Sequence, residues 1–425
     1  MTIEAHQMQG STPRCRSCGA ALSHEVVDLG MSPLCESFLP ADQLDAMERF
    51  YPLRLLVCAE CCLVQLREYV SPDEIFTEYA YFSSFSDSWV RHALAYCEAM
   101  RDRLGLGASS RVVELASNDG YLLQHFVRMG VPVLGVEPAA NVARAAEAKG
   151  VPTRVDFFGV RLARELVAEG IRADLIAGNN VLAQVPDVND FVAGIAVLLA
   201  PGGVVTIEFP HLERTIAGCQ FDQIYHEHFS YFSLLAAERI FARHGLTLFD
   251  VDELPTHGGS LRLYFRHAAA AAPAVSAAVD RLRARELAQG YDDPARLAAF
   301  RDVVEATKRS LLRFLIEAKA AGKRIAGYGA PGKGNTLLNY CGIRTDFVDF
   351  LVDRNPYKHG RFTPGTHIPI RPVEAIDAAK PDYLLILPWN LKHEIMQQMR
   401  HVGEWGCRFV VPIPSVEVIN PEEVG

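Results

Sequence analysis

RVVELASNDGYLLQHFVRMGVPVLGVEPAA, running from Arg111 to Ala140, is the stretch that decides the fold of this chain. An apolar run leads into a Ser-Asn-Asp-Gly turn, an amphipathic segment follows, and a second apolar run ends at Glu137. This order predicts a strand, a tight turn, a helix and a second strand. Such a unit brings backbone N–H groups to the carboxyl edge of a parallel sheet, where nucleotides bind.

The glycines of this turn indicate which nucleotide to expect. A dinucleotide fingerprint needs G-x-G-x-x-G so that bare backbone can approach a pyrophosphate, but only Gly120 is a glycine here. Glu114, near the end of the first strand, would repel a diphosphate and suits the cationic amino group of S-adenosylmethionine (SAM). Glu137 suits two ribose hydroxyls. We therefore rank SAM first, NAD behind it, and a βαβ unit without a ligand last.

Later segments extend the same sheet. Strands are predicted from Asp174 to Asn180, from Val204 to Glu208, and as a closing pair from Thr247 to Asp252 and Ser260 to His267. A helix capped by Ser233 precedes the closing pair. Seven strands with a late hairpin fit the class I SAM methyltransferase sheet. The predicted SAM-binding residues are Glu114, Ser117, Asn118, Gly120, Glu137, Asp156, Phe157 and Asn179.

The overall composition limits the class of protein. The chain has 425 residues, 49% hydrophobic and 22% charged, which predicts an α/β protein of two or three domains with substantial cores. No apolar stretch is long enough to span a membrane, so we expect a cytoplasmic protein without a membrane partner. The net charge of −9 argues against nucleic acid as a general partner.

Six of the ten cysteines fall within the first 62 residues. Two Cys-x-x-Cys pairs separated by a long insert predict a structural zinc site held by Cys15, Cys18, Cys58 and Cys61. Cys62 competes with Cys61 for the fourth position, and the spacing favours Cys61. A nucleic-acid zinc ribbon is the alternative, but the segment lacks clustered Lys and Arg.

The segment after Glu208 is dense in ionisable groups. QFDQIYHEHFSY, Gln220 to Tyr231, gathers two acids, two imidazoles and two phenols on one predicted loop at the carboxyl edge. Tyr225 and His228, three residues apart, can face the same way, with Glu227 placed to orient an imidazole. A metal bound by His226 and His228, or a buried histidine turn, are the competing interpretations. The density of such groups favours a catalytic site.

A second α/β unit follows a helical linker. The sequence from Arg324 to Thr336, RIAGYGAPGKGNT, predicts a strand, a Gly-rich loop and a helix, and a strand from Phe347 to Val352 precedes Asp353. The functional interpretation is a site for a nucleotide-linked substrate, and the alternative is a degenerate Rossmann repeat kept for packing. Predicted substrate-binding residues are His257, Arg262, Lys333, Asn335, Asp353, Arg354 and Lys358.

Together these signals predict three domains. Residues 1–75 form a small zinc-binding module, residues 76–270 a central methyltransferase domain, and residues 271–425 a helical linker followed by a Rossmann-like parallel sheet. Pro273 and Pro294 are expected to break the linker helices.

The chain resembles a known family over nearly its whole length. CxxC…CxxC, ELASNDGYLL, GVEP, GNNVLAQVPD, EFPH, FDQIYHEHFSYFS, THGGSLR, GYGAPGKGNTLLN and DRNPYKHGRFTPGTHIPI are similar to the SAM-dependent deoxysugar C-methyltransferases. The resemblance implies methylation beside the ketone of a nucleotide-linked 4-keto-6-deoxy sugar, taken as C3 of a dTDP-sugar, by a monomer or homodimer. It matches Tyr225, Glu227, His228 and Tyr79 with active-site residues. Gln184 stands where the family usually has histidine.

A mechanism follows as a hypothesis. His228 removes the proton beside the ketone, Glu227 orients the imidazole, and Tyr225 or Tyr79 donates to the enolate oxygen. An NAD-dependent oxidoreductase and a non-catalytic zinc-containing SAM-binding adaptor are the alternatives. For the aromatic segment from Tyr79 to Trp89, a helix start packed on the core is weighed against a lid over the ligand.

Overall fold

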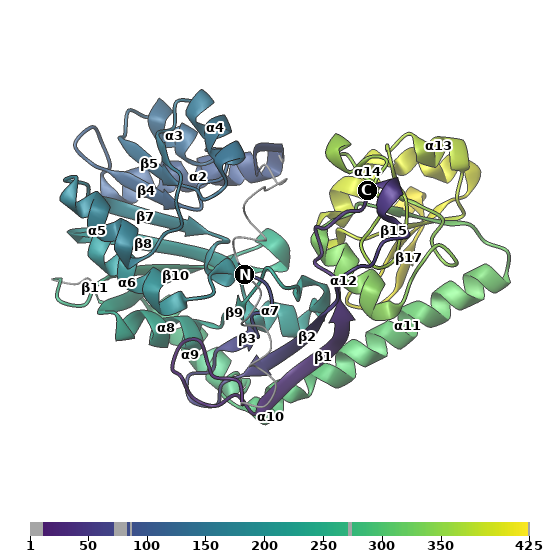
Figure 1. Ribbon diagram of the computed structural model, residues 1–425, viewed down its shortest axis with the longest axis horizontal. Helices are drawn as coiled ribbons and strands as arrows, with labels where there is room; N and C mark the ends of the chain where they lie inside the picture. Colours follow the sequence, from purple (N-terminus) through teal and green to yellow (C-terminus); the bar gives the residue numbers. More distant parts are fainter. Residues whose placement is uncertain (1–11, 72–82, 86, 271–273, 424–425) are drawn as a thin grey trace. The chain divides into compact units, whose positions relative to one another are not determined.

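The computed structural model describes residues 12–71, 83–85, 87–270 and 274–423 (Figure 1). The chain forms two compact units, each assembled from three segments. Unit 1 comprises Met1–His24, Val57–His211 and Glu227–Pro294, and unit 2 comprises Glu25–Leu56, Leu212–His226 and Ala295–Gly425. Residues 1–75 therefore contribute to both units. The three domain limits expected from the sequence remain a prediction.

Unit 1 is built on a seven-stranded sheet (Figure 1). The strand order is β10-β11-β8-β7-β4-β5-β6, with β11 antiparallel to both of its neighbours, β10 and β8, and all other neighbouring strands parallel. The class I methyltransferase sheet with a late antiparallel pair is thus confirmed. The bounds are β4 Val112–Leu115, β5 Val133–Val136, β6 Thr153–Arg154, β7 Ala173–Asn179, β8 Leu199–Pro210, β10 Leu246–Leu254 and β11 Ser260–His267.

Helices cover both faces of this sheet. On one face, α2 (Asp87–Leu104) buries Tyr96 in a core cluster that includes Tyr264 of β11. On the other face, α8 (Leu234–Arg243) stacks Phe241 on Phe265 of β11, with ring centroids 3.9 Å apart. Adjacent strand residues point to opposite faces, so Tyr264 and Phe265 serve the two sides. Further helices are α3 Leu123–Arg128, α4 Ala140–Ala148, α5 Val160–Ala168, α6 Val188–Leu198 and α9 Ala277–Ala288.

The predicted cap of α8 is confirmed. The Ser233 hydroxyl accepts a 3.1 Å hydrogen bond from the backbone N–H of Ala236, which satisfies a donor that has no partner within the helix. Gly245 follows the helix with φ +72°, a left-handed conformation that glycine adopts without strain.

The first strands of the chain fall in both units. β1 (His24–Ser32) and β2 (Tyr51–Val57) are neighbours that belong almost entirely to unit 2. β3 (Val64–Leu66) pairs antiparallel with β9 (Ser230–Tyr231) in unit 1. The β3 and β9 pairing fixes the segment that follows His228.

Unit 2 contains a six-stranded sheet of order β14-β13-β12-β15-β16-β17 (Figure 1). The first five strands are parallel, which confirms the expected Rossmann-like sheet, and β17 adds an antiparallel edge. Strand bounds are β12 Ile325–Tyr328, β13 Leu351–Val352, β14 Ile370–Arg371, β15 Tyr383–Ile386, β16 Arg408–Val411 and β17 Glu417–Ile419. Helix bounds are α7 Leu212–Ala217, α10 Pro294–Ala298, α11 Phe300–Ala320, α12 Gly332–Cys341, α13 Ala375–Ala379 and α14 Lys392–Gln398.

One local expectation in this part of the chain is wrong. The strand predicted from Phe347 to Val352 is shortened to Leu351–Val352, because a turn lies at residues 345–347. The break expected at Pro294 is present: α9 ends at Ala288, and Pro294 begins α10, where a missing N–H costs nothing. Pro273 lies outside the described residues.

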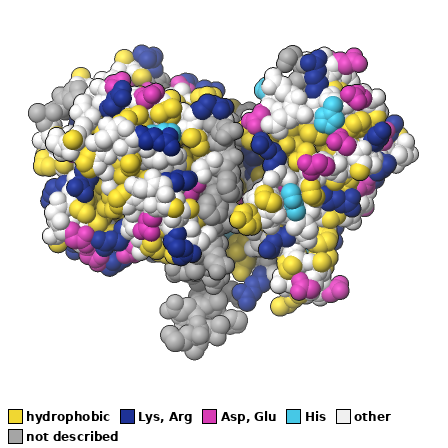
Figure 2. Space-filling model, turned by 90° about the horizontal axis from the view of Figure 1, so that it is seen from above, with side chains coloured by type: hydrophobic (Ala, Val, Ile, Leu, Met, Phe, Trp, Pro, Cys, Tyr) yellow, Lys and Arg dark blue, Asp and Glu magenta, His cyan; other side chains and the backbone are white. Residues whose placement is uncertain are grey.

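The surface carries mixed charge. Basic and acidic side chains are interspersed on the face shown in Figure 2, so the negative charge is not gathered there in one area. Among the described residues, no helix has the length and hydropathy needed to cross a membrane.

Candidate active site

Four cysteine sulfurs of unit 1 converge as the spacing predicts. The Sγ atoms of Cys15, Cys18, Cys58 and Cys61 all lie within 4.8 Å of one another. Tetrahedral zinc with Zn–S bonds of about 2.3 Å places its sulfurs roughly 3.8 Å apart, so this donor set fits the ion. The Gln65 amide donates a 3.2 Å hydrogen bond to Cys15 Sγ, which helps to orient this sulfur toward the other three.

Cys62 lies outside this cluster and has another partner. Its Sγ accepts a 2.8 Å hydrogen bond from Arg239, and its φ of +63° turns the chain after Cys61. The preference for Cys61 as the fourth ligand therefore matches the geometry.

The turn after β4 has the shape expected of a nucleotide site. Gly120 has φ +73°, and a Cβ there would meet Val151 at 3.0 Å. The Glu137 carboxylate accepts hydrogen bonds from the backbone N–H groups of Asn118 at 3.0 Å and Ala139 at 2.9 Å. Glu137 thereby fixes the turn while its remaining lone pairs stay available for ribose hydroxyls.

Polar atoms left without partners line the same edge. Neither carboxylate oxygen of Glu114, the Ser117 hydroxyl nor either amide atom of Asn179 has a hydrogen-bond partner among the described residues, although all are buried. Burial and the nearby Glu137 carboxylate raise the pKa of Glu114 well above its ordinary value, and the Tyr121 hydroxyl offsets only part of the shift. Buried polar groups without partners are costly, so this edge suits a polar, cationic ligand. These residues fit the amino acid end of SAM.

Two predicted cofactor residues, Asp156 and Phe157, are more exposed than Glu114, Ser117 and Asn179. Asp156 forms a 2.6 Å ion pair with Arg161, and the Phe157 side chain is 42% exposed. The carboxylate of Asp156 is thus engaged at the surface, and its predicted contact with the cofactor stays a prediction.

Sequence reasoning missed a buried polar cluster beside Asn179. Glu208 on β8 lies between Asn179 on β7 and Arg262 on β11, its register partners. Its carboxylate accepts a 2.6 Å bond from Arg262 and lies 3.0 Å from His92 Nε2. Arg262 is therefore bound within the protein, and its expected contact with a substrate phosphate stays a prediction. No spacing signal links His92 to Glu208, because 116 residues separate them.

His257, another predicted substrate residue, lies at the same edge. Its Nε2 is 3.3 Å from the side-chain nitrogen of Asn180, and its ring meets the edge of Trp89 at 5.1 Å. Trp89 also stacks on His92 at 5.0 Å. The start of α2 thus covers the sheet edge with aromatic rings.

The predicted catalytic residues Tyr225, Glu227 and His228 lie just before β9. Glu227 is buried, while Tyr225 and His228 are partly exposed. The His228 ring meets the edge of Tyr231 with centroids 6.2 Å apart. Tyr79 lies outside the described residues, as do residues 80–82 and 86 of the aromatic segment.

The competing metal interpretation of this segment gains no support. His226 is buried, its Nε2 lies 3.3 Å from the carbonyl oxygen of Pro52, and burial lowers its pKa. Among residues 12–71, 83–85, 87–270 and 274–423, the four cysteines form the one grouping suited to a metal.

The motif that precedes this segment is anchored in the core of unit 1. His211 Nε2 lies 2.7 Å from the buried Glu286 carboxylate, which also accepts the backbone N–H groups of Leu234 and Leu235 at 2.8 and 3.0 Å. One acid from α9 thus holds both the end of β8 and the start of α8.

In unit 2 the glycines of the Gly-rich loop serve packing. A Cβ at Gly329 would meet Pro388 at 2.5 Å, and one at Gly332 would meet Cys35 Sγ and Glu36 Oε1 at 2.9 Å. The anion beside the first turn of α12 is therefore the chain's own Glu36. This packing role is the alternative raised for the loop, and its phosphate contact stays a prediction.

Asp353 repeats the arrangement of Glu137 in unit 2. It follows β13 and accepts hydrogen bonds from the backbone N–H groups of Ala330 and Asn355, each at 2.8 Å. Each acid thus accepts one hydrogen bond from the loop that follows the preceding strand in the chain and one from the residue two positions after itself. The predicted contact of Asp353 with the substrate stays a prediction.

The remaining predicted substrate residues of unit 2 have partners within the protein. The Asn335 amide donates to the carbonyl of Cys35 at 2.5 Å, and Lys358 lies 3.4 Å from Glu36. Lys333 bonds to Asn390 and lies over the Trp389 ring. Arg354 remains 66% exposed and 3.7 Å from a carboxylate oxygen of Glu394.

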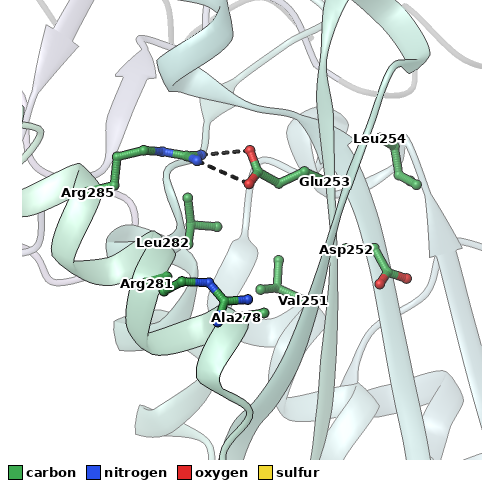
Figure 3. A pocket seen from close by; sticks show the side chains of 8 residues that line it. All are labelled: Val251, Asp252, Glu253, Leu254, Ala278, Arg281, Leu282 and Arg285. Carbon is green, nitrogen blue, oxygen red and sulfur yellow. Dashed lines mark hydrogen bonds and ion pairs between the residues drawn. The ribbon is translucent and has the colours of Figure 1, made fainter.

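A separate surface groove of unit 1 contains none of the predicted residues. It lies between β10 and α9, where Arg285 binds Glu253 through two nitrogens at 2.7 and 3.1 Å (Figure 3). This ion pair attaches the helix that carries Glu286.

Three family models match the chain. The "Putative zinc binding domain" matches residues 15–76, the "Methyltransferase domain" residues 89–251, and the "C-methyltransferase C-terminal domain" residues 255–414. The ubiquinone biosynthesis O-methyltransferase of Rhizobium etli (strain CIAT 652) is 34% identical over 23% of this chain and 40% of its own. The solved 1,6-didemethyltoxoflavin-N1-methyltransferase of Burkholderia thailandensis aligns with 48% of this chain and 94% of its own, with 18% identity and a TM-score of 0.36.

One relative matches almost from end to end. The C-methyltransferase NovU of Streptomyces niveus is 36% identical over 408 residues, which cover 96% of this chain and 97% of that protein. Combined with the class I sheet, the cofactor edge and the four-cysteine cluster, this match identifies the reaction class and excludes the NAD-dependent alternative. The chain belongs to the C-methyltransferase family, and it is a SAM-dependent methyltransferase with a zinc-binding cysteine cluster.

Proposed function

We propose that this enzyme methylates the carbon beside the ketone, at C3, of a 4-keto-6-deoxy sugar linked to a nucleotide such as dTDP. The observation that carries the proposal is the Tyr225 to His228 segment, which follows the cofactor sheet and brings a phenol, a carboxylate and an imidazole together within four residues. A carbon beside a ketone is acidic enough for an imidazole to deprotonate, which an isolated sugar carbon is not.

The proposed chemistry assigns one task to each side chain. His228 takes the proton from the carbon, and the buried Glu227 carboxylate stabilises the imidazolium that forms. Tyr225, or Tyr79, donates its hydroxyl to the oxygen that gains charge. A positioned base contributes about 10²–10⁴ in rate and an oxyanion donor about 10²–10³. SAM, when bound, supplies the electrophilic methyl group that replaces the proton.

Three of the cofactor residues proposed for this reaction, Glu114, Ser117 and Asn179, have buried polar atoms without a hydrogen-bond partner among the described residues, and the fourth, Glu137, accepts two backbone hydrogen bonds. Glu114 faces the amino group, Glu137 the ribose, and Ser117 and Asn179 add hydrogen bonds. A carboxylate on the amino group and another on the ribose set the position of the sulfonium between them.

Unit 2 is proposed to hold the nucleotide of the substrate. Support comes from Asp353, whose two backbone hydrogen bonds repeat those of Glu137. The charges of Arg354, Lys358 and Lys333 are proposed to attract the diphosphate.

Incubation of the enzyme with SAM and a panel of nucleotide-linked sugars tests the proposal. The panel contains dTDP-4-keto-6-deoxyglucose, its 4-hydroxyl counterpart, and the same keto sugar on UDP. We expect a mass gain of one methylene unit for keto sugars alone, with the position read by NMR. Methylation of the 4-hydroxyl sugar, or of no keto sugar, contradicts the proposal.

A further inference from the structure

The carboxylate of Glu208 is fully buried and collects three donors. Arg262 Nη2 donates at 2.6 Å, His92 Nε2 lies at 3.0 Å, and the Thr256 hydroxyl donates at 3.1 Å. Burial by itself would raise the pKa of Glu208, but the bond from His92 and the charge of Arg262 lower it below its ordinary value. Glu208 is therefore an ionised acceptor.

This ionised carboxylate determines the tautomer of His92. His92 Nε2 lies 3.0 and 3.2 Å from the two oxygens of Glu208, which can only accept, and 3.2 Å from Arg262 Nη2, which can only donate. Arg262 Nη2 already donates to Glu208 at 2.6 Å, so the two carboxylate contacts favour the tautomer of the neutral imidazole with its proton on Nε2. Nδ1 is then left with a lone pair. An acid behind an imidazole is the arrangement by which proteins orient a functional histidine.

The register of the sheet places His92 at the cofactor edge. Glu114 on β4 pairs with Ala177, two residues before Asn179, and Asn179 pairs with Glu208. Register partners and residues two apart share a face of the sheet, so Glu114, Asn179 and Glu208 lie on one face, with Glu114 two residues behind the row of Asn179 and Glu208. Neighbouring strands are about 4.8 Å apart, which puts Glu208 roughly 10 Å along the sheet from Glu114.

The His92 ring stacks on Trp89 at 5.0 Å, but packing alone does not account for a histidine at this position. The buried side chains of α2 include Ala93, Tyr96 and Met100, whereas the His92 side chain keeps 21% exposure at the start of the helix. The charge of Glu208 is already balanced by Arg262, so the imidazole is not needed for neutrality. An oriented, partly exposed imidazole next to the cofactor edge is available for a ligand.

We propose that His92 is a further substrate-binding residue of this methyltransferase, held by Glu208, and that its Nδ1 accepts a hydrogen bond from a hydroxyl or amino group of the methyl acceptor. The acceptor class is that of the proposed function, on which this inference rests. Glu114 holds the charged end of the cofactor, and His92 orients the molecule that receives the methyl group. The residue acts in binding, and the base remains His228.

Two substitutions at His92 separate this role from a structural one. His92→Phe keeps a planar ring and removes both nitrogens, while His92→Gln retains an amide that can donate to Glu208 and accept from the substrate. With dTDP-4-keto-6-deoxyglucose as the probe, we expect His92→Phe to raise the KM for the sugar by about tenfold. The Kd for SAM should change by less than twofold, and His92→Gln should recover most of the KM.

The matched control is His401→Phe, which removes an imidazole from a 2.8 Å pair with Asp377 on the surface of unit 2. It should leave both constants unchanged. An unchanged KM in His92→Phe overturns the inference, and so does an equal rise in KM and in the Kd for SAM, or a His92→Gln variant as impaired as His92→Phe at the same melting temperature. If the wild type methylates no keto sugar, the proposed function fails before His92 is at issue.

Discussion

Trp389 donates its indole N–H to the Asp222 carboxylate at 2.7 Å, and both side chains are buried. Asp222 lies three residues before Tyr225, so Trp389, in the short helical turn after β15, holds the turn that leads into the proposed catalytic segment. The Thr336 hydroxyl adds a 3.1 Å bond to the carbonyl of Ile224. The Rossmann-like unit therefore shapes this segment directly, whatever else it binds.

Trp389→Phe removes this hydrogen bond while keeping an aromatic ring. The other oxygen of the Asp222 carboxylate has no partner among the described residues. Loss of the Trp389 hydrogen bond should therefore lower the unfolding free energy by about 1–3 kcal/mol. We expect lower kcat with little change in the Kd for SAM, measured by urea unfolding, steady-state kinetics and calorimetry. Thr336→Val, which removes one neutral bond, should act in the same direction and more weakly. Full kcat in both variants would show that the catalytic segment does not depend on these contacts.

Lys333 gives stability a specific dependence on pH. Burial lowers its pKa to about 8, against an ordinary value of 10.5, and the nearby Asp222 carboxylate offsets part of the shift. Lys333 loses its proton more readily in the folded protein than in the unfolded chain. The folded state is therefore stabilised above pH 10.5, and this stabilisation is lost as pH falls through about 8. The unfolding free energy of the wild type minus that of Lys333→Met should rise by ~1–3 kcal/mol from pH 7.5 to pH 9.5. A constant difference would mean that Lys333 titrates as an exposed lysine.

Adjacent cysteines provide a matched test of the zinc site. Cys61→Ser removes a sulfur from the cluster, whereas Cys62→Ser removes an acceptor for Arg239. We expect Cys61→Ser to lose most of its zinc and several degrees of melting temperature, because metal binding contributes directly to folding free energy. Cys62→Ser should keep one zinc per chain. Elemental analysis and thermal unfolding decide the matter, and equal zinc loss in both variants would point to a different fourth ligand.

Glu114 should couple SAM binding to protons. Its pKa is raised well above the ordinary value by burial and by Glu137, and the positive charge of the cofactor favours the ionised form. SAM binding should therefore release a proton in mildly acidic solution, and the Kd should fall as pH rises. Calorimetry in buffers of different ionisation enthalpy measures the release. Glu114→Gln should bind SAM more weakly, and its binding should release no proton. Proton uptake in the wild type would place the cofactor's amino group elsewhere.

The sequence predicted the framework well because its signals are local. Apolar runs gave the strands, Ser233 marked the start of a helix, and two Cys-x-x-Cys spacings marked the zinc cluster. Each of these depends on residues close together in the chain.

What escaped prediction depends on long-range pairing. His92 meets Glu208 across 116 residues, and Trp389 meets Asp222 across 167. The packing of the Gly-rich loop escaped prediction for another reason: close approach of a phosphate and close approach of Cys35 and Glu36 require the same glycine at position 332. Composition alone cannot tell these two neighbours apart.

Proton exchange at the reacting carbon tests the central claim most directly. With S-adenosylhomocysteine in place of SAM, the enzyme in deuterium oxide should place deuterium at the carbon beside the ketone of dTDP-4-keto-6-deoxyglucose, read by NMR. We expect His228→Asn to reduce this exchange at least a hundredfold while binding SAM as the wild type does. Exchange at the wild-type rate in His228→Asn would contradict the assignment of His228 as the base.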